Sequence, residues 1–228
     1  MRTIRVTGRG QRKLHPDLTR ITITLEGSFT DYEQTLQRSS EDTEQLRSLL
    51  GGFGFAPQDL KTLSFNVDTQ YEGYQENGVF RQRFTGYLFR HEMTLEFDSD
   101  NALLGRILYA LSASPVRPTF QIGYTVKDPE AAKNQLLEQA VRDAAGKAAV
   151  LCRAAGASLK GIASIDYSWG QPNLETRPVN RLMMAEGAAL RSAKASLDVN
   201  IQPEDIEVSD TVTVVWEIEP DREGAAKT

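Results

Sequence analysis

The sequence has few of the residues on which several classes of function depend. Its 228 residues include one cysteine and two histidines, and the formal net charge is −5. The single cysteine, Cys152, cannot form an internal disulfide, and its alanine-rich helical surroundings predict a small buried thiol. An acidic chain has no electrostatic attraction for phosphate backbones, so we expect no nucleic-acid partner.

Long apolar runs are also missing. No stretch approaches the roughly 18 apolar residues that a membrane-spanning helix needs, which predicts no transmembrane segment. The opening residues MRTIRV alternate as a strand does, and they predict no signal peptide. We expect a cytoplasmic protein if Met1 is the native start, and a periplasmic or secreted one if a leader has been removed.

A glycine pair near the start raises the possibility of a phosphate loop. Gly8 and Gly10 follow a predicted strand, as such a loop requires. No third glycine follows at the fingerprint spacing, no Gly-Lys-Ser/Thr follows either, and the next element is a strand and not a helix. We therefore interpret residues 8–17 as a connection in which the glycines allow a β-bulge or a close strand crossing, and Pro16 opens the next strand.

The remaining chemistry-bearing residues form no recognisable site. His15 lies in the predicted turn, and His91 lies on the apolar parity of a strand, where a hydrogen-bonded structural histidine is expected. The sequence has no H-x-x-x-H, C-x-x-C or G-x-S-x-G spacing. The run Asp98–Asp100 lacks the glycine and terminal glutamate of a calcium loop, and it favours a helix cap.

We therefore predict no catalytic, metal-binding or cofactor-binding residue, no cofactor, and a protein that is not an enzyme. An undetected enzyme stays open as an alternative. A cleft in which His15 or His91 meets two or more carboxylates would favour it.

Apolar periodicity predicts one α+β domain over residues 1–228. It would contain a mixed, largely antiparallel sheet with helices packed on one face. The first helix is expected to begin with a capping box of Thr30 and Glu33, and the last with Asp128-Pro129. Strands are expected at 2–7, 18–27, 63–67, 87–97, 120–126, 161–169 and 207–219, and helices at 30–51, 99–112 and 129–156.

Two segments stand out from this regular pattern. Residues 68–86 form the tip of a long hairpin, with turn-rich residues at 71–78, and residues 170–204 form a long irregular arm. Aromatic and basic side chains at the tip and methionines in the arm predict an interaction surface, with simple hairpin packing as the alternative for the tip. The candidate residues are Tyr71, Tyr74, Phe80, Arg81, Arg83, Met183 and Met184.

The order and spacing of these motifs resemble those of the SIMPL-domain family, also called DUF541, over about residues 2–219. No single motif is specific, but the series as a whole is. The chain is similar at V-x-G-x-G, at P-D, at G-Y and in the segment beginning at Asp128-Pro129. The signature positions are Gly8, Gly10, Pro16, Asp17, Gly86, Tyr87, Asp143, Lys147 and Gly156.

The resemblance implies a bacterial α+β protein of poorly defined role and offers no catalytic residues. Some family members resemble large ring-like homo-oligomers, and the proposed roles include stress protection, surface antigen and scaffold. Our leading hypothesis is a non-enzymatic protein that associates with itself, or with another protein, and acts as an interaction scaffold. The alternative is a carrier of a small apolar ligand, which the 170–204 arm could cover with Leu182, Met183 and Met184.

Overall fold

The computed structural model describes residues 2–167 and 203–220. Their strands form two separate antiparallel sheets, so the predicted α+β class is confirmed, whereas one mixed sheet was expected. The chain divides into two compact units. The first contains residues 2–16, 126–167 and 204–220, and the second contains residues 17–125.

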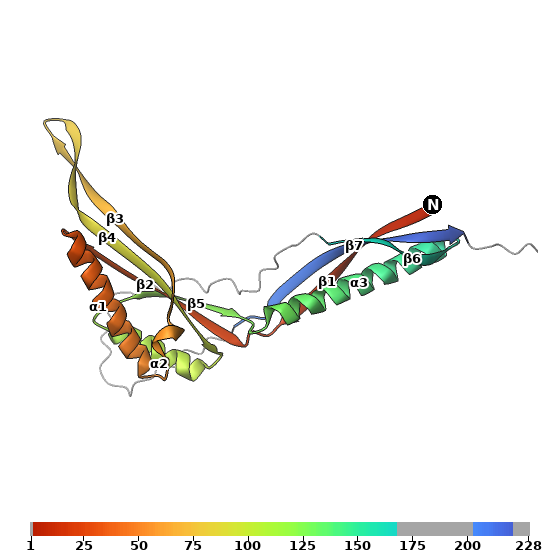
Figure 1. The fold of residues 1–228 in the computed structure, drawn as a ribbon, viewed down its shortest axis with the longest axis horizontal. Helices are drawn as coiled ribbons and strands as arrows, with labels where there is room; N and C mark the ends of the chain where they lie inside the picture. Colours follow the sequence, from red (N-terminus) through yellow and green to blue (C-terminus); the bar gives the residue numbers. More distant parts are fainter. Residues whose placement is uncertain (1, 168–202, 221–228) are drawn as a thin grey trace, which may run out of the picture. The chain divides into compact units, whose positions relative to one another are not determined.

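The first unit is a three-stranded sheet with one helix along it. Strands β1 (Arg2–Leu14), β7 (Ile206–Pro220) and β6 (Ala157–Asp166) lie in the order β1-β7-β6, and α3 (Pro129–Ala154) packs on one face (Figure 1). Large side chains alternate toward the helix from β7, as predicted, and small ones face them from α3. The buried residues are Val6, Val212, Val214, Trp216, Ala140, Ala144 and Ala148.

The glycine pair lies inside strand β1 and not in a turn. Pairing of β1 with β7 is continuous from Arg2 to Leu14, so the predicted bulge and the predicted connection over residues 8–14 are wrong. The glycines serve the helix instead. A Cβ on Gly8 would lie 2.0 Å from the carbonyl oxygen of Ala140, and one on Gly10 would lie 2.1 Å from that of Leu136. Their hydrogens let the backbones of α3 and β1 meet.

The second unit is a four-stranded sheet covered on one face by two helices (Figure 1). Alternation along the strands places one apolar face toward the helices, and that face forms the larger core. The strand order is β3 (Lys61–Glu76), β4 (Val79–Asp98), β2 (Leu18–Phe29), β5 (Thr119–Thr125). The helices are α1 (Tyr32–Gly51) and α2 (Asn101–Ala113), with a short 3₁₀ turn η1 (Pro57–Asp59).

Each helix begins at an aspartate whose carboxylate accepts from the first-turn amides. Asp128 accepts from Ala131 N, and Asp100 accepts from Ala102 N and Leu103 N, as the sequence predicts. Helix α1 begins one residue later than predicted. Asp31, and not Thr30, is its cap and accepts from Gln34 N at 3.0 Å.

Candidate functional site

The β3–β4 hairpin extends beyond the rest of its sheet. Residues 71–78 were expected to be turn-rich, but β3 continues to Glu76, and only Asn77 and Gly78 form the turn before β4 begins at Val79. Both turn residues have positive φ, at 52° and 80°, as Asn-Gly hairpin turns favour. Because β2 pairs with β4 only from Tyr87 onward, β3 is the one described strand that pairs with residues 79–86 (Figure 1).

An irregularity in the ladder marks the place where the hairpin leaves the sheet. Gln70 pairs with Gly86 and Tyr71 pairs with Phe84, so Thr85 is an extra residue in β4. Gly86 has φ +143°, and a Cβ there would lie 2.3 Å from the carbonyl oxygen of Phe29. Because Thr85 is an extra residue, the parity of β4 changes at this position. On the tip side, over residues 79–84, the even-numbered side chains lie on the face that the odd-numbered side chains occupy from Tyr87 onward.

A row of aromatic side chains therefore extends the helix-covered face outward. Tyr32, at the start of α1, lies edge-on to Tyr87, with ring centroids 5.2 Å apart. Tyr87 lies 5.1 Å from Phe84, and Phe84 lies 5.9 Å from Tyr71. Phe80 follows on the same face by strand parity and is 82% exposed. We call Tyr71, Phe80 and Phe84, which no described helix covers, the aromatic strip.

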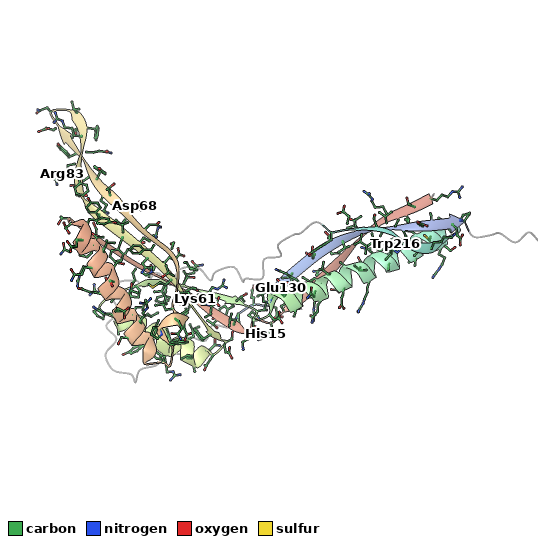
Figure 2. All side chains as sticks on the ribbon, viewed as in Figure 1. His15, Lys61, Asp68, Arg83, Glu130 and Trp216 are labelled. Carbon is green, nitrogen blue, oxygen red and sulfur yellow. The ribbon has the colours of Figure 1, made fainter. Side chains whose placement is uncertain are left out.

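The opposite face of the hairpin tip is charged. Arg83 pairs with Glu72 at 2.8 Å, and Arg81 pairs with Glu76 at 3.1 Å, across the two strands. Tyr74 lies on this face by its register with Arg81. Figure 2 shows Arg83 on the outer part of the hairpin.

The structure thus divides the predicted interaction surface between two faces. Tyr71 and Phe80 lie on the aromatic face, whereas Tyr74, Arg81 and Arg83 lie on the charged face. Sequence reasoning missed Phe84 as the link between Tyr71 and the body, because the parity change at Thr85 has no sequence signal. Met183, Met184 and residues 170–202 of the predicted arm lie outside the described residues.

His91 is a buried titratable ring of the second unit, with 9% of the residue exposed. Its Nδ1 lies 3.1 Å from Thr43 Oγ1 and its Nε2 lies 2.9 Å from Thr62 Oγ1. Thr43 uses its only hydroxyl proton to donate to the carbonyl of Ser39 at 2.7 Å, so it accepts from Nδ1–H. In the neutral ring Nε2 then accepts from Thr62, and the edge of Phe65 packs on the ring at 5.2 Å between centroids.

The enclosure of His91 predicts a stability that depends on pH. Burial, and secondly the charge of Arg47, lower the pKa of His91 below its ordinary value of 6.5. As the pH falls below 6.5, the unfolded state takes up the proton while His91 in the folded state stays neutral. The free energy of unfolding therefore decreases until the pH reaches the lower pKa of the folded state. Each pH unit between the two pKa values corresponds to about 1.4 kcal/mol.

Urea unfolding between about pH 7.5 and pH 5 tests this expectation. His91→Gln should flatten the decrease, and His15→Gln should retain it, because the chain has only these two histidines and His15 is exposed. Equal slopes in wild type and His91→Gln would contradict the assignment.

His15 makes a single acidic contact, with Asp205 at 3.2 Å. His91 contacts two hydroxyls, so neither histidine meets two carboxylates within the described residues. Over the same residues no group of three or more His, Cys, Asp or Glu side chains is placed to hold a metal ion. No helix in the described part of the chain is long and apolar enough to cross a membrane.

Comparison with known families decides where the chain belongs. The family model SIMPL, described as a protein of unknown function (DUF541), matches residues 4–216 of the 228 residues. The chain belongs to the SIMPL family. A search of curated proteins gives no significant match to it.

Two of the predicted signature residues, Asp143 and Lys147, cover the outer edge of the first sheet. The odd-numbered residues of β1 direct their backbone groups away from β7, to a side where no described strand lies. Helix α3 satisfies these groups at steps of one turn: Asp143 accepts from Arg9 N at 2.7 Å, and Lys147 donates to Thr7 O at 3.4 Å. Gln139, one turn earlier, accepts from Gln11 N at 3.0 Å. Such cover prevents pairing with another strand.

The contacts of Asp143 also lower its pKa. This pKa lies below its ordinary 3.8 because Lys147 and, secondly, the Arg9 N–H donate hydrogen bonds to the carboxylate.

The remaining predicted signature residues have structural positions as well. Pro16 is buried, and Asp17 N donates to Thr125 O at 3.2 Å at the start of the second unit. Gly156 has φ +62° directly after α3.

Proposed function

We propose that this SIMPL-family chain is a non-enzymatic, self-associating protein that presents its β3–β4 hairpin as an interaction scaffold. One observation carries the proposal: the apolar face that α1 and α2 cover elsewhere continues as the aromatic strip, over which the described part of the chain places no helix. Phe80 is 82% exposed, Tyr71 58% and Phe84 46%. Grouped exposed aromatics of this kind are typical of contact surfaces and costly to leave in water.

A second copy of the chain suits this surface in charge as well as in apolarity. In the tip, β3 contributes acidic Glu72 and Glu76, whereas β4 contributes basic Arg81 and Arg83. Both strands have open outer edges over this stretch within the described residues. The β3 edge of one copy can therefore pair with the β4 edge of another, with opposite charges adjacent and the two aromatic strips continuous.

The surroundings of the histidines support the non-enzymatic part of the proposal. Both nitrogens of His91 are engaged by threonine hydroxyls, and the residue is only 9% exposed. A general base needs a nitrogen that can reach a substrate proton. His15 is exposed beside a single aspartate and has no second acidic contact in the described part of the chain.

Light scattering coupled to gel filtration tests the proposal. Wild type at micromolar concentration should have a mass of at least twice 25.3 kDa. The double variant Phe80→Ser/Phe84→Ser should associate with itself at least about tenfold more weakly than wild type, because aromatic residues buried in an interface contribute most of its binding energy. The matched control Tyr74→Ser/Val79→Ser removes similarly exposed side chains from the opposite face and should keep the wild-type mass.

Two outcomes would overturn the proposal. One is a wild type that elutes with the mass of a single chain. The other is an oligomer whose stability is the same in the strip variant and in the control. Circular dichroism of all three proteins shows whether the folds are intact.

A further inference from the structure

A shallow groove lies between α1 and the outer strand β3, away from the hairpin tip. Its volume is about 230 Å³, smaller than the usual site for a drug-sized molecule. Helix α1 contributes Leu36 and a set of polar residues that we call the polar wall, namely Ser39, Ser40, Thr43, Glu44 and Arg47. The strands contribute Phe65 and His91, and the side chains of Leu36 and Phe65 are exposed by 37% and 43%. The groove therefore offers apolar and polar side chains together.

Ser39 is the unusual member of the polar wall. The residue is 3% exposed, yet its hydroxyl makes no hydrogen bond with any described residue. Its carbonyl is already used by Thr43, whereas the hydroxyl oxygen stays accessible from the groove. Because this hydroxyl is accessible and has no partner among the described residues, it can donate to an acceptor in the groove in place of water.

Arg47 supplies the charge of the polar wall. It donates to Glu44 through Nη1 at 2.6 Å, and among the described residues Nη2 has no partner. A guanidinium can serve two acceptors through separate N–H groups, and its bonds to carboxylates are stronger than those to neutral oxygens. Glu44 itself also lines the groove but is held by the bond to Nη1.

We propose that this groove binds a small carboxylic acid with a flat apolar group, such as an aromatic monocarboxylate. The carboxylate would accept from Arg47 Nη2 and from the hydroxyls of Ser39 and Ser40. The apolar ring would lie against Leu36 and Phe65. The site is separate from the aromatic strip, so it does not depend on self-association.

Titration of benzoate into protein with isotope-labelled histidine tests the site by nuclear magnetic resonance. The ring signals of His91 should shift and saturate at millimolar benzoate. The pKa of His91 should rise on saturation, because a nearby anion favours the imidazolium. Benzamide, which has the same shape without the charge, should bind at least about tenfold more weakly.

Substitutions on α1 test whether benzoate binding depends on the residues that line the groove. Arg47→Gln should weaken benzoate binding about tenfold or more, and Ser39→Ala should weaken it several-fold. Arg38→Gln is the matched control, because Arg38 forms the same kind of helical ion pair, with Glu41 at 3.0 Å, and does not line the groove. It should bind benzoate as wild type does.

Three results would overturn the proposal. They are no saturable shift of His91, equal binding of benzoate and benzamide, and unchanged affinity in Arg47→Gln. If Arg47→Gln does not fold, the comparison of the two probes on wild type and on Ser39→Ala decides the question.

Discussion

Replacement of Gly8 by alanine is expected to destabilise the first unit by about 3 kcal/mol. The added Cβ would lie 2.0 Å from Ala140 O, 2.5 Å from Ala144 N and 2.7 Å from Ala144 Cβ. Two of these atoms belong to the backbone of α3, so no side-chain rotation can relieve the contact. The helix must move away from β1, which would also lengthen the hydrogen bonds that Asp143 and Gln139 accept from the backbone of the strand.

Urea unfolding measures this effect, and Trp216 is a suitable reporter because it is 6% exposed in the core of the same unit. Gly161→Ala is the matched control. It lies on β6 of the same sheet and has no atom within 4 Å of an added Cβ. We expect the control to unfold within about 1 kcal/mol of wild type. If Gly8→Ala were as stable as this control, the close contact of α3 and β1 would be contradicted.

Replacement of Gly86 by alanine is expected to destabilise the second unit by a similar amount, about 3 kcal/mol, from two separate causes. The backbone has φ +143°, where a Cβ is strained by about 1–3 kcal/mol. The Cβ would also lie 2.3 Å from Phe29 O and 2.9 Å from Phe29 C. The strand would have to separate from the end of β2, where the hairpin leaves the sheet.

The hairpin provides graded controls for Gly86→Ala. Gly78→Ala introduces strain alone, because φ is +80° and no atom lies within 4 Å. Gly73→Ala introduces neither strain nor contact. The loss of stability in urea unfolding should increase from Gly73 to Gly78 to Gly86, and any other order would show that the two causes are wrongly assigned.

Strand parity and two of the three helix caps were the parts of this fold that the sequence could predict. The alternation at Ile21, Ile23 and Leu25 and the Asp128-Pro129 start depend on neighbours in the chain, and both are confirmed. The role of Gly8 and Gly10 was predicted wrongly. A glycine pair indicates a close approach but not which partner approaches, and α3 lies more than a hundred residues away.

The candidate site was predictable only in part for the same physical reason. The aromatic residues of the hairpin are visible in the sequence, but the division into two faces depends on Thr85, whose extra position changes the parity. The groove beside His91 lies between α1 and β3, and its polar wall includes serines that look ordinary in a helix sequence. That the Ser39 hydroxyl opens into the groove becomes visible only once its surroundings are packed.

The ladder of hydrogen bonds from α3 to β1 has a mechanical consequence. Three side chains of α3 each bind one backbone group of the strand, namely Gln139, Asp143 and Lys147. Gly8 and Gly10 leave room for the helix backbone at Ala140 and Leu136. A slide of the helix along the strand would break all three bonds at once and bring side chains against the glycine backbone. We therefore expect α3 and β1 to resist sliding past each other over Gln139–Lys147, where these bonds lie.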